Sequence, residues 1–292
     1  MKKENQLPKL SMTNGKHHIE VFDPRTDPTF LGARYVHGGY ISAWHYNDRC
    51  LTGRPNEEWN PSQGEGLPEV FECGLGWCDA KEREEFLRIG AGRLKKDGDH
   101  WMQMDGEPSS MVEWTVAEQT RDSVVMRCRD EAVIGKTDYR YELERRINVH
   151  PDGLESRTRL SIKCPWSYPV FWFAHPFFAH QDGSGTSLRI PEGADLGRGL
   201  RPTAAGDISG RLTTAKSGGF GPITGMWGWL RPIKVELDSR FGGGTVSMEV
   251  SKPLDKLVVY ATPRVFSVEP YIARAWHEEE EAEWGIRYRF FP

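Results

Sequence analysis

The sequence predicts an all-β protein, an antiparallel sandwich or barrel, and three observations predict it. Apolar and polar residues alternate with period two in most patterned segments, as they do in half-buried strands. Glycine, proline and aspartate, which favour turns, are spread along the whole chain. Helical periodicity is scarce, and its best candidate is a short charged segment at residues 79–87. No long linker interrupts this pattern, so we expect residues 1–292 to form one domain.

The strongest hairpin signal lies in the middle of the chain. Residues 141–149 alternate between apolar and polar side chains, and residues 154–163 form a second run. Between the two runs, Pro151, Asp152 and Gly153 form a turn sequence. We therefore expect two long antiparallel strands joined by this turn.

Other runs predict the remaining strands. Residues 111–117 and 123–128 are separated by five residues and predict a second hairpin. Residues 245–250 and 284–291 alternate again. Residues 257–260 are continuously apolar, which is typical of a strand covered on both faces.

One stretch has little pattern of this kind. Residues 183–221 are rich in glycine and only weakly periodic. We expect long loops there, lying over one face of the sandwich and able to wall a cleft.

Composition and charge argue against several classes of protein. The formal net charge is −4 at pH 7, and no run of five basic residues occurs, which argues against a nucleic-acid surface. No stretch approaches the roughly 20 apolar residues that cross a membrane, and the amino terminus lacks the apolar core of a signal peptide. We expect a cytoplasmic protein that binds neither nucleic acid nor a membrane.

The cysteines indicate neither disulfides nor a metal. There are five of them, an odd number, and they are scattered along the chain. Cys73 and Cys78 are separated by four residues and lack the second pair that a structural zinc site needs. We expect no metal site.

Two ionisable residues stand within apolar segments. His175 lies in the aromatic run 169–178, and Glu269 ends the apolar run 265–269, directly before Pro270. A carboxylate in such a place is unfavourable unless it has a partner. A structural role, as a core histidine and a buried ion pair, and an acid–base role are both open on these patterns alone.

Several segments together resemble the aldose 1-epimerase-like (galactose mutarotase-like) family. In that family, a strand with a His-Pro-aromatic-Phe element carries the acid, and an apolar strand ending in Glu-Pro carries the base. His175 and Glu269 stand at the matching positions and in the same order. Residues 225–229 with 235–237 resemble the turn and strand before the Glu-Pro strand, and residues 282–290 resemble the closing strand. The resemblance covers roughly residues 110–292.

This resemblance implies an antiparallel β-supersandwich, galactose mutarotase-like, and an enzyme that interconverts the anomers of a sugar. Ring opening needs one base at the anomeric hydroxyl and one acid at the ring oxygen, so the reaction requires no metal or cofactor. A small sugar or sugar derivative is the implied partner. The candidate sugar contacts are Arg34, His37, His180 and Trp229. A structural role is also open for Arg34 and His37, and His180 could instead be an ordinary loop histidine.

The chain also departs from the family at two places. Galactose mutarotases carry an upstream histidine in a His-Gly-Phe element, whereas the comparable His100 is spaced too far from Trp114. Ala174 stands where an asparagine often precedes the acid histidine. Two alternatives therefore stay open. One is a lyase acting on a uronate-type glycoside through Arg34, Tyr35 and His37, and the other is a sugar-binding protein without activity.

Overall fold

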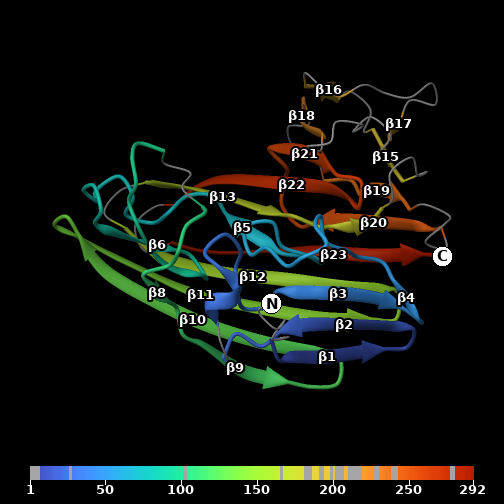
Figure 1. The fold of residues 1–292 in the computed structure, drawn as a ribbon, viewed down its shortest axis with the longest axis horizontal. Coiled ribbons are helices and arrows are strands. Elements are labelled where there is room, and N and C mark those ends of the chain that lie inside the picture. The colour runs from blue at the N-terminus through green and yellow to red at the C-terminus, as the bar shows by residue number, and fades with distance from the viewer. Residues whose placement is uncertain are drawn as a thin grey trace.

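The computed structural model shows an antiparallel β protein with no α-helix among the residues it describes, which confirms the predicted fold class (Figure 1). A single 3-10 turn, η1 (Pro28–Leu31), is its only helical element in this part of the chain. The described residues are 7–25, 28–100, 104–164, 167–180, 186–190, 194–197, 200, 207–209, 219–225, 230–237, 243–276 and 280–292.

Two large sheets form the sandwich. The nine-stranded sheet runs β17 (Asp207–Ser209), β15 (Ser187–Arg189), β19 (Ile233–Glu236), β20 (Thr245–Val250), β23 (Glu280–Phe291), β12 (Gly153–Lys163), β11 (Thr137–His150), β10 (Ser123–Ile134), β9 (Trp114–Gln119). The seven-stranded sheet runs β16 (Asp195–Leu196), β18 (Gly219–Thr224), β21 (Lys256–Ala261), β22 (Val265–Trp276), β13 (Tyr168–Ala174), β5 (Glu69–Phe71), and β14 (Phe178–Ala179) also pairs with β22.

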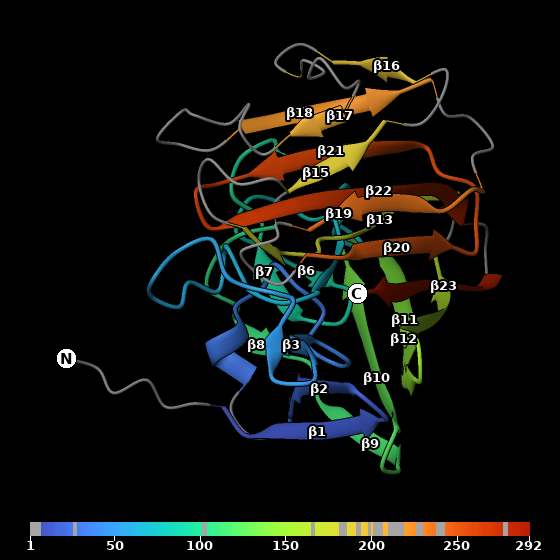
Figure 2. The same cartoon turned by 90° about the vertical axis from the view of Figure 1, so that its right-hand side faces the viewer.

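Two small sheets complete the fold. One contains β1 (Lys9–Asn14), β2 (His17–Phe22), β3 (Ile41–Tyr46) and β4 (Arg49–Cys50), and the other contains β6 (Glu85–Arg88), β7 (Gly92–Lys95) and β8 (Ser110–Met111). Figure 2 shows the seven-stranded sheet as a stack with β16 and β18 at one end, and β1 and β2 at the far end of the molecule.

The main core lies between the two large sheets. The rings of Phe71 and Trp172, from the seven-stranded sheet, lie 6.1 and 5.8 Å from the ring of Trp284 in the nine-stranded sheet. Strand β11 buries every second residue over most of its length, as the period-two pattern predicts. A second, smaller hydrophobic cluster includes Tyr35, Phe173 and Tyr271. It lies on the opposite face of the seven-stranded sheet, because Phe173 alternates with the core residue Trp172 along β13.

A buried ion pair links the two large sheets. Glu69 of β5 forms an ion pair with Arg145 of β11, and both side chains are almost completely buried. Ser156 of β12 donates a hydrogen bond of 2.6 Å to Glu69, and Trp172 donates one of 2.8 Å. Glu69 and the two terminal nitrogens of Arg145 are therefore hydrogen-bonded, as buried charges require, while the Arg145 Nε has no partner among the described residues.

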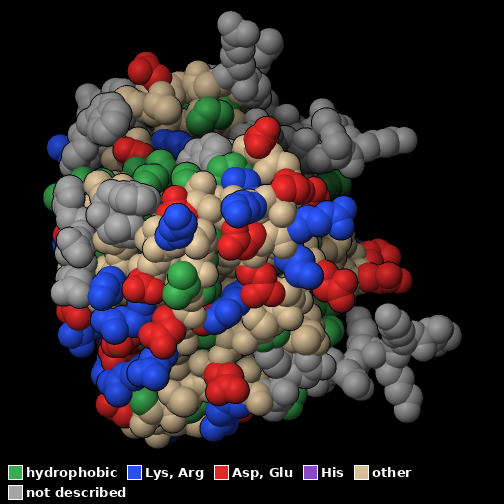
Figure 3. All heavy atoms as spheres, turned by 90° about the vertical axis from the view of Figure 1, so that its left-hand side faces the viewer, with side chains coloured by type: hydrophobic (Ala, Val, Ile, Leu, Met, Phe, Trp, Pro, Cys, Tyr) green, Lys and Arg blue, Asp and Glu red, His purple; other side chains and the backbone are tan. Residues whose placement is uncertain are grey.

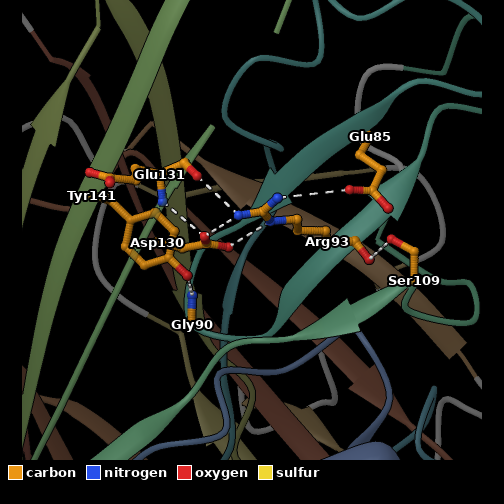
Figure 4. Close-up of polar contacts among 7 residues, drawn as sticks. All are labelled: Glu85, Gly90, Arg93, Ser109, Asp130, Glu131 and Tyr141. Carbon is orange, nitrogen blue, oxygen red and sulfur yellow. Dashed lines mark hydrogen bonds and ion pairs between the residues drawn. The ribbon is translucent and has the colours of Figure 1, made fainter. Parts of the chain in front are cut away.

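A second polar cluster attaches the β6–β7 hairpin to the nine-stranded sheet. Arg93 donates to both carboxylate oxygens of Asp130 on β10, at 3.1 and 2.6 Å (Figure 4). Gly90 donates its backbone N–H to the Tyr141 hydroxyl at 3.1 Å. The Gly90 carbonyl in turn accepts the backbone N–H of His37 at 3.0 Å, so this cluster also positions the segment around residues 32–39.

The predicted hairpins are present, with one change of partner. Strands β11 and β12 pair around the turn at residues 151–152, and β9 pairs with β10. Met111, expected at the start of the second hairpin, belongs instead to β8 and pairs with Gly92 of β7.

Two sequence-based expectations are wrong. Residues 79–87 do not form a helix, because Arg83 has a φ of +65° and Leu87 instead exchanges backbone hydrogen bonds with Leu75. Residues 183–221 are not loops throughout, because four short strands, β15 to β18, extend the edges of both large sheets there.

The surface carries both signs of charge. On the face drawn in Figure 3, acidic and basic side chains are interspersed. The described residues include no helix long and apolar enough to cross a membrane.

Candidate functional site

The candidate site lies on the face of the seven-stranded sheet that points away from the main core. His175 directly follows β13, where its backbone N–H donates to the Pro68 carbonyl at 2.8 Å. Glu269 lies on β22, the neighbour of β13. The strand pairing brings the two residues together, with His175 Nε2 3.3 Å from Glu269 Oε1.

A serine orients the histidine ring. Ser267 is two residues before Glu269 on β22, so both side chains point to the same face. A hydrogen bond of 3.1 Å joins Ser267 Oγ and His175 Nδ1. The ring is therefore held at both nitrogens, with Nε2 directed at the carboxyl group.

Burial shifts the pKa values of both groups toward their neutral forms. His175 is 6% exposed and Glu269 is 3% exposed. Burial raises the pKa of the Glu269 carboxyl to about 8, although the positive charge of Arg34 opposes this shift. Burial lowers the pKa of His175 well below its ordinary value, and the charge of Arg34 acts in the same direction. Near neutral pH the pair therefore holds one proton.

Aromatic rings enclose the pair. The ring of Phe177 lies 4.3 Å from that of His175, and Tyr260 and Tyr35 approach edge-on at 5.8 and 6.3 Å. Such surroundings exclude water and strengthen electrostatic interactions within the site.

Arg34 provides a positive charge beside the pair. Its Nη1 lies 3.2 Å from Asp105 Oδ2, while its Nε is buried and has no hydrogen-bond partner among the described residues. The backbone of Arg34 is held by Arg88, which is fully buried and donates to the carbonyls of Ala33, Arg34 and Glu72 at 3.4, 3.4 and 3.1 Å.

A second polar group adjoins Glu269. Tyr271, two residues further along β22, donates its hydroxyl to Glu72 Oε1 at 3.2 Å. Burial raises the pKa of Glu72. Lys256 Nζ lies 4.2 Å from the centre of the Tyr271 ring. The face around Glu269 thus offers a carboxyl, a phenol and an ammonium group.

Sequence reasoning did not find these last residues. Glu72 had a usable signal, because it is an acidic residue in the largely apolar run 67–75. Tyr271 directly follows the Glu-Pro pair and is two residues after Glu269. On a strand, this spacing places the two side chains on the same face of the sheet.

His37 and His180, two of the other predicted sugar contacts, have different surroundings. His37 is completely buried, its Nε2 hydrogen-bonds the Gly32 carbonyl at 2.7 Å, and burial lowers its pKa to about 4. His180 packs at 6.2 Å against Phe266, whose side chain points to the opposite face of β22 from Glu269. Trp229 lies outside the described residues.

No metal site is visible in the described part of the chain, where no three histidine, cysteine or acidic side chains come together in a way that could hold an ion.

Comparison with solved structures identifies the fold. The Slr1438 protein from Synechocystis sp. PCC 6803 superposes with a TM-score of 0.66 at 15% identity, covering 98% of this chain and 96% of that one. A galactose mutarotase related enzyme from Lactobacillus acidophilus gives 0.62 at 13% identity, with 98% of each chain covered. A GalM/aldose epimerase homologue from C. elegans gives 0.58 at 10% identity, covering 97% of this chain and 98% of that one.

No protein-family model matches the chain, and no curated protein matches it in sequence. The structural matches nevertheless span nearly the whole chain. The chain therefore has the galactose mutarotase-like fold, and the predicted resemblance is confirmed at the level of fold.

Proposed function

We propose that this protein is an aldose 1-epimerase-like isomerase that interconverts the anomers of a sugar through His175 and Glu269. The observation that carries the proposal is their direct contact, 3.3 Å between Nε2 and Oε1, in a buried site on this fold. Two ionisable groups whose pKa values are shifted in opposite directions by burial are typical of acid–base sites.

In the proposed reaction Glu269 accepts the proton of the anomeric hydroxyl, and His175 donates a proton to the ring oxygen. The bond between the anomeric carbon and the ring oxygen breaks, which gives the open-chain aldehyde. Rotation about the adjacent carbon–carbon bond and closure through the other face, with both proton transfers reversed, give the second anomer. The starting proton count of the site is then restored.

The proton shared by the pair makes these roles compatible with the pKa shifts. In the free protein, burial favours a neutral carboxyl and a neutral imidazole. Moving that proton from Glu269 to His175 gives the carboxylate base and the imidazolium acid without any change in total charge. Hydrogen bonds from sugar hydroxyls to Glu269 stabilise its ionised form and favour this state.

Arg34 and the Glu72–Tyr271 pair are the proposed sugar contacts. The buried Nε–H of Arg34 has no acceptor among the described residues and can donate to a sugar hydroxyl. Glu72 and Tyr271, on the same face as Glu269, offer an acceptor and a donor for further hydroxyls.

Exchange NMR of anomeric protons, across a panel of free aldoses, tests the proposal. The wild-type protein should accelerate exchange for at least one sugar. Glu269→Gln and His175→Asn should each lower that rate by about 10²–10⁴-fold, because each removes one proton-transfer group. Sugar affinity should be retained, and the exposed Glu107→Gln variant should behave as wild type.

The same experiment distinguishes the alternatives. A lyase would convert a uronate glycoside into an unsaturated product with new vinyl proton signals. Tyr35, one of the two candidate bases for that reaction beside His37, is unfavourably placed, because it is buried, donates to the Gln63 carbonyl at 2.8 Å and has a raised pKa. Sugar binding with no acceleration of exchange would instead identify a non-catalytic binding protein and overturn the proposal.

A further inference from the structure

Ser267, His175 and Glu269 form a chain of three polar side chains with the imidazole ring at its centre. Ser267 Oγ lies 3.1 Å from Nδ1 of the ring, and Glu269 Oε1 lies 3.3 Å from Nε2. Ser267 is completely buried, and the other two side chains are nearly so. Because bulk water is largely excluded, the neighbours of the ring decide where its protons lie.

A neutral imidazole carries its proton on either Nδ1 or Nε2, and the two forms have different consequences here. With the proton on Nδ1, the ring donates to Ser267, and Nε2 is free to accept from the protonated Glu269 carboxyl. With the proton on Nε2, Nδ1 accepts from Ser267, and Nε2 has no lone pair for the Glu269 proton. Only the first form allows this proton to pass directly from Glu269 to His175.

The backbone of His175 favours the proton on Nδ1. Burial and the charge of Arg34 lower the pKa of the ring, and a hydrogen bond to the backbone of His175 itself opposes them. A carbonyl oxygen can only accept, and Nδ1 is the ring nitrogen nearer to the backbone of its own residue. Nδ1 is therefore a donor, and the Ser267 hydroxyl beside it is an acceptor.

The hydroxyl proton of Ser267 has its own acceptor. Burial raises the pKa of Glu269 to about 8, whereas the charge of Arg34 and a hydrogen bond with the Ser267 side chain lower it. A hydrogen bond lowers the pKa of a carboxyl group when it stabilises the ionised form, so Ser267 donates to Glu269. Ser267 thus accepts from His175 and donates to Glu269, and both bonds strengthen when the pair becomes imidazolium and carboxylate.

We propose that Ser267 is a positioning residue that holds His175 with its proton on Nδ1, so that Nε2 exchanges the shared proton directly with Glu269. In this exchange the O–H bond of the Glu269 carboxyl breaks and an N–H bond forms at Nε2, with no change in total charge. The Ser267 hydroxyl stabilises both products. The inference rests on the proposed function, because this exchange prepares the base and the acid that ring opening uses.

Long-range ¹H–¹⁵N spectra of histidine-labelled protein at neutral pH test the proposal without any sugar, since the ¹⁵N shifts show which ring nitrogen carries the proton. His175→Asn identifies the His175 signals among those of the nine histidines. The wild type should carry the proton on Nδ1, and Ser267→Ala should populate the Nε2 form. Ser247→Ala, which alters a buried serine of the nine-stranded sheet, should match the wild type. A proton on Nε2 in the wild type, or an unchanged spectrum in Ser267→Ala, would overturn the proposal.

The kinetic consequence is a loss of rate without a loss of sugar binding. Ser267→Ala should lower kcat/KM for anomer exchange by roughly 10–100-fold at nearly constant KM, because two hydrogen bonds to charged groups are lost. Ser267→Thr keeps the hydroxyl and should retain most of the rate.

The pH profile separates this role from simple packing. In Ser267→Ala the alkaline limit of kcat/KM should move to higher pH, because the ionised Glu269 loses a hydrogen-bond donor. The substitution leaves in place the other titratable groups that act on the pair through charge, which are Arg34, Tyr35, Glu72, Lys256, Tyr260 and Tyr271. A lower rate with an unmoved alkaline limit would mean that Ser267 only fills space.

The two measurements also distinguish this inference from the proposed function. Anomer exchange by a protein with the His175 proton on Nε2 would refute the role of Ser267 alone. A proton on Nδ1 that depends on Ser267, in a protein that accelerates exchange of no aldose, would refute the proposed function alone.

Discussion

At the scale of single residues, the proton content of one buried pair sets the chemistry available to the site. With two protons, both His175 and Glu269 are acids, and with none, both are bases. Only the state with one proton supplies the acid and the base that sugar ring opening needs. The two pKa values bound the pH range of this state, because burial raises the pKa of Glu269 to about 8 and lowers that of His175 well below its ordinary value.

The anomer-exchange rate should therefore fall above about pH 8, where the free protein loses its only site proton. Below that pH the rate should stay level through neutrality and fall only in acid, when His175 gains a second proton. The pH profile of kcat/KM for the best aldose measures both limits, since it reports the free enzyme. A rate that instead rises through pH 8 would mean that Glu269 acts alone as the ionised base.

The site was only partly predictable from sequence. His175 and Glu269 are recognisable because each is an ionisable residue in an apolar run with a distinctive neighbour, Pro176 or Pro270. Ser267 and Arg88 are not recognisable in this way, because their contacts with His175 and Arg34 join segments far apart in the sequence. His37 and His180 were proposed as sugar contacts on residue type, and their environments depend on packing that a local pattern does not encode.

At the scale of elements, the long hairpins follow directly from the sequence, because alternation and turn residues are local signals. The helix candidate at residues 79–87 does not form, for a nonlocal reason. Backbone pairing between Leu75 and Leu87 and the left-handed conformation of Arg83 override a charged pattern that is compatible with a helix. The short strands β15 to β18 were missed because they are edge additions with little alternation of their own.

Gly153 should be the most sensitive position in the β11–β12 hairpin. It has a φ of +155°, and a Cβ there would overlap the carbonyl oxygen of Tyr288 on β23. Gly153→Ala should therefore lower the free energy of unfolding by about 2–4 kcal/mol, since it combines backbone strain with a steric clash. Urea denaturation measures this change.

Gly15, in the β1–β2 turn, is the matched control. It also has a positive φ, +63°, but a Cβ there has no heavy atom within 4 Å. Gly15→Ala should lower the free energy of unfolding by only about 1–2 kcal/mol, because it introduces backbone strain without a steric clash. Equal losses in the two variants would mean that the contact with Tyr288 contributes nothing.

At the scale of the whole molecule, the Glu69–Arg145 pair ties the two large sheets together. Arg145→Met leaves Glu69 buried without its counter-charge, so unfolding free energy should fall by about 3–5 kcal/mol. Adding Glu69→Gln removes that charge and should recover part of the loss. The neighbouring Arg146→Met, whose partner Glu118 is exposed at 3.6 Å, should change stability by less than about 1 kcal/mol. If the double variant loses as much stability as Arg145→Met alone, the loss comes from packing and not from the unpaired charge.

The proposed site also makes the stability of the whole molecule depend on pH. The ordinary pKa of a glutamate is 4.5, and that of Glu269 is raised to about 8. Between these values the folded protein holds a proton that the unfolded chain has released. The stabilisation is therefore complete below about pH 4.5 and is lost as the pH rises toward 8, by up to about 1.4 kcal/mol per pH unit.

Glu269→Gln cannot ionise, so it should match the wild type near pH 5 and exceed it in stability by about 1–3 kcal/mol at pH 8. The contact with His175 limits this difference in stability between the variant and the wild type, because the His175 ring can accept the proton that Glu269 releases. Thermal unfolding at a series of pH values measures it, with the exposed Glu107→Gln variant as the control for loss of one carboxylate. A stability difference that does not change with pH would mean that Glu269 ionises in the folded protein as it does in the unfolded chain. The one-proton state on which the proposed reaction depends would then be absent at neutral pH.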